Sequence, residues 1–156
     1  MFLFYYIYFG IVPVLILFLP YLLLTGQSLT TYHATQIFVI LIIFGMFVLF
    51  EFLHGKYETS MKKSMLILVS TAFSMASVWF FTTAPALYCT AISSAVCMMV
   101  WAIYFWARAF LDDISERKQL IFGIIGSLLG ALAFGCRPPV ALCNLVIVPF
   151  LYGYIK

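Results

Sequence analysis

The chain has 156 residues, of which 66% are apolar and only 8% are charged, and its mean hydropathy is +1.17. A soluble domain is excluded, because it could not cover its surface with polar groups. The formal charge of +3 comes from Lys and Arg beside apolar segments and gives no indication of nucleic-acid binding. We expect residues 1–156 to form a single membrane domain.

The first apolar run covers residues 2–24 and is interrupted by Gly10, Pro13 and Pro20. It has two interpretations: it crosses the membrane, or these residues break it into a segment that lies in or re-enters the outer leaflet. Its ring-rich start, residues 2–9, favours the second interpretation, because aromatic side chains prefer the headgroup interface. A signal peptide is not expected, because no basic region precedes the run.

The lengths of the later apolar runs predict helices, and the first of these runs has no break. We expect these helices over Tyr32–Leu53, Ser64–Phe81, Leu87–Leu111, Leu120–Cys136 and Val140–Ile155. An uncharged turn around Pro85 separates the second of them from the third, and Pro138 with Pro139 precedes the last. The expected fold is all-α: a polytopic transmembrane helix bundle of about five full spans plus one broken or re-entrant segment.

Hydroxyl side chains gather in the Ser64–Phe81 run: Ser70, Thr71, Ser74 and Ser77. Such hydroxyls can bond back to their own helix or across to a neighbour. No charged residue accompanies them at the middle of the run, so they do not indicate a polar path across the membrane.

Positive charge is distributed on one side of the expected bundle. The loops after Tyr32–Leu53 and Leu87–Leu111 contain, or are flanked by, Lys56, Lys62, Lys63, Arg108, Arg117 and Lys118. The loops after the first run and after Ser64–Phe81 contain no Lys or Arg. The positive-inside rule therefore places the charged loops in the cytoplasm and Arg137 on the outer face of a multi-pass cell-membrane protein.

Small residues recur at four-residue spacing along residues 120–136. The row is Gly123, Ser127, Ala131 and Gly135, and Gly126 with Gly130 lies beside it. Small side chains let another helix approach closely, so we expect a packing partner through Gly123, Gly126, Ser127, Gly130 and Ala131, and a central place for this helix. The alternative is that glycine is simply frequent in membrane helices.

The cysteines and histidines do not indicate a metal site. The four cysteines lack paired spacing and are expected to be buried apolar residues, with a Cys89–Cys136 disulfide as the alternative. His33 and His54 lie at opposite ends of one expected helix. Glu51 is expected to extend toward the interface near Lys56, and a buried functional carboxylate is the alternative.

Arg137 is the strongest candidate for a functional residue. A lone cation beside two prolines is costly near a bilayer, and its planar guanidinium suits phosphate oxygens. Pro138 and Pro139 break the helix and leave carbonyls that need partners, which predicts a polar pocket; the alternative is an arginine that only anchors at the interface. His33 and Asn144 are further substrate-binding candidates, whose alternatives are an interfacial side chain and a hydrogen bond to a neighbouring helix.

Several motifs, in their order along the chain, resemble the amino-terminal portion of GT-C fold membrane glycosyltransferases of the dolichyl-phosphate-mannose and aminoarabinose transferase type. They are Tyr8–Pro13 (Tyr-Phe-Gly-x-x-Pro), the turn around Pro85, Tyr104–Ala109 and Gly130–Pro139. The resemblance implies sugar transfer from a polyprenyl-phosphate carrier at the outer face. It also implies that Arg137 matches a basic residue near the carrier phosphate.

The chain departs from this family in its carboxylates. Such enzymes use an acidic residue of the first outer loop, whereas every Asp and Glu here is expected at the cytoplasmic side. We therefore assign no catalytic residue and no cofactor, and we expect a part of a larger membrane protein without activity of its own. Two other classes stay open: a small transporter or channel subunit that binds an anion at Arg137, and a non-catalytic membrane scaffold.

Overall fold

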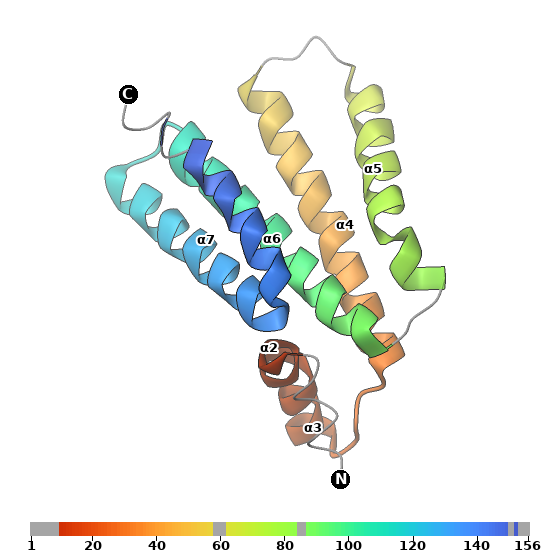
Figure 1. Cartoon of the computed structure of the whole chain (residues 1–156). Coiled ribbons are helices and arrows are strands. Elements are labelled where there is room, and N and C mark those ends of the chain that lie inside the picture. Colours follow the sequence, from red (N-terminus) through yellow and green to blue (C-terminus); the bar gives the residue numbers. More distant parts are fainter. Residues whose placement is uncertain (1–9, 58–61, 84–86, 150–151, 153–156) are drawn as a thin grey trace.

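The computed structural model describes residues 10–57, 62–83, 87–149 and 152, and every regular element in them is helical (Figure 1). The elements are α2 (Ile11–Pro13), η1 (Val14–Phe18), α3 (Leu19–Thr25), α4 (Thr31–Lys56), α5 (Lys63–Thr83), α6 (Leu87–Leu111), α7 (Glu116–Cys136) and η2 (Pro138–Val146). The expected all-α class is confirmed. Residues 2–9, Glu58, Pro85 and the end of the last expected helix lie outside the described residues.

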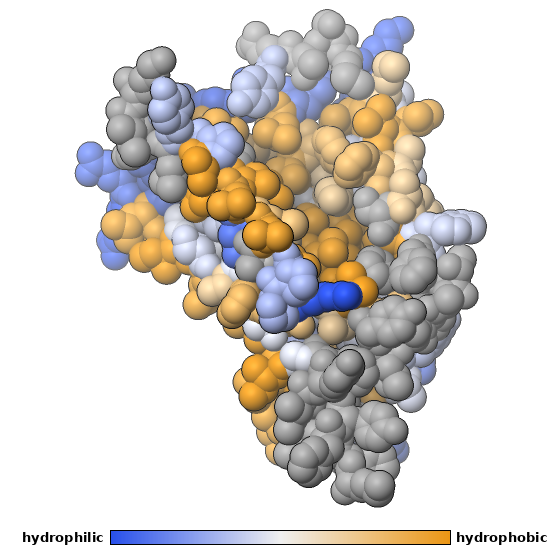
Figure 2. Space-filling view, in the orientation of Figure 1, coloured by the Kyte–Doolittle hydropathy of each residue, from blue (hydrophilic) through white to orange (hydrophobic). Residues whose placement is uncertain are grey.

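Within the described residues, three helices are long and apolar enough to cross a membrane: Thr31–Lys56, Cys89–Leu111 and Glu116–Cys136. Shorter apolar helical stretches are Ile11–Thr25, Lys63–Ala76, which is the first part of α5, and Pro138–Pro149. Hydrophobic residues cover much of the middle of the face shown in Figure 2. The structure thus supports a helical membrane protein with three span-length helices.

The first apolar run is helical over residues 11–25 but contains a wide π turn. This turn, η1, comes directly before Pro20, whose ring would otherwise meet a carbonyl of the preceding turn. Gly26 then ends α3 in a left-handed conformation with φ of 70°, and its amide donates to the Leu22 carbonyl at 2.9 Å. Glycine suits this cap because it has no Cβ to oppose a positive φ.

Helix α6 is at the centre of the bundle. In the most apolar stretch of α6, 61% of the helix is buried within the protein, compared with 22% in the corresponding stretches of α4 and α7. The expectation that residues 120–136 form the central helix is therefore wrong. Small side chains permit one close approach, whereas a central position needs neighbours on several sides. In α6, Ala95 and Ala102 belong to the cluster with α2 and α7, whereas Cys97 and Val100 belong to the cluster with α4 and α5.

Two apolar clusters hold the helices together. One joins α2, α6 and α7 and includes Val12, Trp106 and Ala133. The other joins α4, α5 and α6 and includes Phe38, Ile42, Val78 and Val100. Because α6 contributes to both clusters, it connects the α4–α5 pair with the α2–α7 side of the molecule.

Hydroxyl groups bond both within and between helices. In α5, Thr71 donates to the Ile67 carbonyl and Ser74 to the Ser70 carbonyl, each at 2.7 Å, so these hydroxyls bond back to their own helix. Between α4 and α6, the buried hydroxyls of Thr35 and Thr90 are 2.9 Å apart. Interhelical bonds of this kind typically contribute about 0.6 kcal/mol in a membrane protein.

All four cysteines are free thiols. Cys89, Cys97 and Cys136 are buried and Cys143 is exposed, so their expected role as buried apolar residues is confirmed for three of them. The alternative Cys89–Cys136 disulfide does not form. Cys89 instead belongs to the apolar cluster between α4, α5 and α6, and Cys136 to the one between α2, α6 and α7.

The glycines of α7 differ sharply in what surrounds them. A Cβ at Gly126 would lie 2.5 Å from Cδ1 of Trp106, and one at Gly130 would meet the same ring at 3.2 Å. A Cβ at Gly123 would meet no atom within 4 Å, and Ser127 and Ala131 are exposed. Within the chain, close packing therefore uses Gly126, Gly130 and also Gly135, whose added Cβ would lie 2.6 Å from a methyl carbon of Val12. The other three members of the predicted row, Gly123, Ser127 and Ala131, are left uncovered.

Candidate functional site

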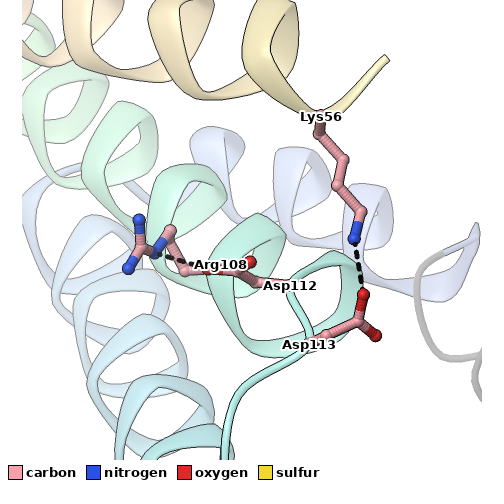
Figure 3. Close-up of polar contacts among 4 residues, drawn as sticks. All are labelled: Lys56, Arg108, Asp112 and Asp113. Atoms are coloured by element: carbon pink, nitrogen blue, oxygen red, sulfur yellow. Dashed lines mark hydrogen bonds and ion pairs between the residues drawn. The ribbon is translucent and has the colours of Figure 1, made fainter. Parts of the chain in front are cut away.

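The acidic residues between α6 and α7, Asp112 and Asp113, and Glu116 at the start of α7 lie at one end of the bundle with most of the described basic residues, as the alternating directions of α4 to α7 require (Figure 1). Lys56 Nζ at the end of α4 is 3.2 Å from an Asp113 oxygen just after α6 (Figure 3). Arg108 Nε is 3.4 Å from an Asp112 oxygen one turn later in the chain. Solvent-accessible pairs of this kind contribute about 0–1 kcal/mol each, but the Lys56–Asp113 pair shows that the ends of α4 and α6 meet on one side.

Arg108 also packs against aromatic rings from two other helices. Its guanidinium carbon lies 5.3 Å from the ring centre of Phe52 in α4 and 5.7 Å from that of Phe122 in α7. A cation over an aromatic face is attracted by the ring quadrupole, more strongly when water is excluded. This three-helix contact was not predicted, because nothing in the sequence places Phe52 and Phe122 on either side of Arg108.

Arg137 lies at the opposite end of the bundle, between α7 and η2 (Figure 1). Its backbone is extended, with φ of −154° and ψ of 110°, as expected for a residue before proline. Its amide donates to the Ala133 carbonyl and its carbonyl accepts from the Val140 amide, both at 3.0 Å. The helix break predicted from Pro138 and Pro139 is therefore present, and both backbone groups of Arg137 have partners.

The side chain of Arg137 is half-buried and makes no hydrogen bond or ion pair with the described residues. Among those residues it is also the one Lys or Arg at this end of the bundle. The described carboxylates that pair with basic residues, Asp112 and Asp113, lie at the other end. A guanidinium in this setting is available to an external anion.

Asn144 contacts α7. Its Nδ2 donates to the Gly130 carbonyl at 3.2 Å, while its Oδ1 is buried without a hydrogen-bond partner in the described structure. The missing Cβ of Gly130 provides the space for this oxygen. Two roles were considered for Asn144, substrate binding and a hydrogen bond to a neighbouring helix. The observed hydrogen bond to α7 corresponds to the second role.

His33 lies in the first turn of α4, close to the Thr30 cap. Its Nδ1 is 2.6 Å from Thr30 Oγ1, and its ring meets Tyr32 edge-on at 5.6 Å between centres. It lines an open cavity of about 490 Å³ between α3 and the start of α4. Neither Arg137 nor Asn144 lines this cavity, so it does not bring the three predicted site residues together.

Acidic and metal-ligating side chains are not gathered near either candidate site. Glu51 is exposed, so it is not the buried functional carboxylate that was the alternative for this residue. In the described part of the chain, no three His, Cys, Asp or Glu side chains come together as a metal site would require. The arrangement offers recognition chemistry through a cation and hydrogen-bonding groups, and it offers no assembled acid–base pair among these residues.

No protein-family model, curated protein or solved structure matches the chain. The resemblance to GT-C glycosyltransferases therefore rests on the short motifs quoted above and on the position of Arg137.

Proposed function

We propose that the chain is a non-catalytic membrane part of a polyprenyl-phosphate-sugar glycosyltransferase-like protein and that Arg137 binds the carrier phosphate. The observation that carries this proposal is the half-buried residue Arg137, whose guanidinium has no described partner and which lies at the end of the bundle away from the paired charges. An arginine keeps its charge in an apolar surround, and its planar fork matches two phosphate oxygens.

The backbone around Arg137 supports the same proposal. Helix α7 ends at Cys136 and the chain continues in the tighter η2 helix, so Arg137 lies at a fixed bend. Because Pro138 and Pro139 have no amide hydrogen, their backbone cannot donate hydrogen bonds to a bound anion, and the Arg137 guanidinium would provide both the donors and the charge. The membrane arrangement that we propose with it has about five spans, a re-entrant first segment and a cytoplasmic charged end.

We expect Arg137→Ala to weaken binding of a polyprenyl phosphate by about 1.5–3 kcal/mol, which corresponds to roughly a 10- to 150-fold rise in Kd. Arg137→Lys keeps the charge but loses the bidentate geometry, so it should fall between the wild type and the alanine variant. Affinity can be measured by native mass spectrometry of the purified full chain. Arg117→Ala, at the other end of the bundle, is the matched control and should leave Kd unchanged. Equal Kd values for wild type and both Arg137 variants, with unchanged helicity, would overturn the proposal.

The orientation is tested by cysteine labelling in intact cells. With the native cysteines replaced, a cysteine at Lys62, near the charged end, should be protected from an impermeant maleimide because that end is cytoplasmic. A cysteine at Thr83, at the other end of α5, should be labelled from outside. Labelling at Lys62 without labelling at Thr83 would reverse the orientation and place Arg137 in the cytoplasm.

A further inference from the structure

The cavity between α3 and α4 has lining groups of two kinds. At one end it offers hydrogen-bonding side chains from the α3–α4 connection and the first turns of α4, among them Gln27, Ser28, His33 and Gln36. At the other end it is lined by Ile37 and Ile40. The two isoleucines are 37% and 65% exposed, so the apolar wall continues onto the outer surface of α4.

The polar end is lined by uncharged hydrogen-bonding groups and an imidazole. No Asp, Glu, Lys or Arg side chain is among the lining residues. The side-chain amides of Gln27 and Gln36 make no hydrogen bond within the described structure, and each offers both donors and acceptors. Such groups match hydroxyls, which also donate and accept, better than they match a phosphate, which needs cations or several N–H donors.

The length of α4 indicates where the cavity lies relative to the bilayer. Its 26 residues extend about 39 Å, which exceeds the roughly 30 Å hydrocarbon core of a bilayer, so its terminal turns reach the headgroup region. His33 lies in the first turn of the helix, whereas Ile40 lies two turns farther along it. The polar end of the cavity therefore lies near the headgroups and the apolar end faces the acyl chains.

Local hydrogen bonds shape the connection between α3 and α4, which lines the polar end. Gly26 turns the chain, Thr25 Oγ1 accepts from the Gln27 amide at 3.2 Å, and Thr30 caps α4 by accepting from the His33 amide at 3.4 Å. These local bonds satisfy backbone groups of the connection and leave the Gln27 and Gln36 side chains available to a ligand.

We propose that this cavity binds a membrane lipid with an uncharged, hydroxyl-rich headgroup, such as a hexose or glycerol group, with its acyl chain along Ile37 and Ile40. The amides of Gln27 and Gln36 hydrogen-bond the hydroxyls, and the rings of Tyr21 and His33 provide faces against which a sugar can pack. The site does not depend on the proposed role of Arg137, which does not line the cavity.

The test uses the full chain in phosphatidylcholine nanodiscs with a photoactivatable monoglucosyl diacylglycerol. We expect saturable crosslinking to residues 21–40, competed by the unlabelled glucosyl lipid and not by phosphatidic acid. Gln36→Leu should raise the half-saturating concentration roughly two- to tenfold, as expected for one lost hydrogen bond. Gln119→Leu, the same change at the other end of the bundle, should leave it unchanged.

Arg137→Ala separates this inference from the proposed function, because it should leave the crosslinking intact even if it abolishes polyprenyl-phosphate binding. Crosslinking spread evenly over the helices would overturn the inference. Competition by phosphatidic acid as strong as that by the glucosyl lipid would also overturn it, because the site would then select charge. A Gln36→Leu curve that coincides with the Gln119→Leu curve would show that the amide does not bind the headgroup.

Discussion

Replacing Trp106 with alanine is expected to destabilise the bundle by about 3 kcal/mol, the largest stability loss that we expect from a single change. The indole is only 2% exposed and fills the space in front of Gly126 and Gly130. Because lipid is as apolar as the protein core, moving the indole between them changes the free energy little, and the cost comes mainly from lost packing contacts. The expected destabilisation therefore lies at the low end of the range for soluble proteins. Loss of the unpartnered Nε1 donor offsets a small part of the cost.

The measurement is the free energy of unfolding in mixed micelles, followed by far-ultraviolet circular dichroism during titration with a denaturing detergent. Trp79→Ala in α5 is the matched control, because that side chain is 67% exposed and faces the surroundings of the bundle. It should change the free energy by about 0.5 kcal/mol or less. An equal loss in both variants would contradict the central packing role of Trp106.

We expect Gly126→Leu to cost about 1–3 kcal/mol by overpacking. Even the first carbon of the new side chain would lie 2.5 Å from the Trp106 ring and 3.2 Å from the Ala102 carbonyl oxygen. The ring is enclosed and the carbonyl belongs to the backbone of α6, so α6 and α7 would have to separate. The same unfolding titration measures the change.

Gly123→Leu is the control for this prediction, since it places the same side chain one turn earlier on α7 where no atom lies within 4 Å of the new Cβ. It should leave stability within about 0.5 kcal/mol of the wild type, with a gain in helix propensity. If Gly123→Leu were as damaging as Gly126→Leu, close packing of α6 and α7 would not explain the effect.

The long helices were predictable because their signals are local. Residues 32–53 contain no proline and no Asp, Glu, Lys or Arg before Glu51, and the structure extends that helix only to Thr31 and Lys56. The helix expected over residues 87–111 has the same bounds in α6. The end at Cys136 followed from the two prolines. These features depend on neighbours in the sequence and need no knowledge of tertiary packing.

The features that failed or were missed depend on tertiary contacts. Four-residue spacing could not show that Gly126 faces Trp106 while Ser127 is exposed. The row that contains Gly126 and the row that contains Ser127 have the same spacing, so the sequence does not tell which of them faces another helix. The expected helix from Val140 begins instead as the 3₁₀ segment η2, which brings the Asn144 amide to the Gly130 carbonyl. The cavity near His33 was missed because it depends on the left-handed turn at Gly26, which redirects the chain from α3 to α4.

The position of α6 between the two clusters has a consequence for biosynthesis. The buried face of α4, with Phe38 and Ile42, is completed by residues of α6 such as Cys97 and Val100, which are synthesised after α5. Until α6 is made, much of that face has no protein partner and must be covered by lipid or by the insertion machinery. The α4–α5 hairpin therefore has to wait for α6, and α6 in turn acquires its second interface when α7 follows it out of the ribosome.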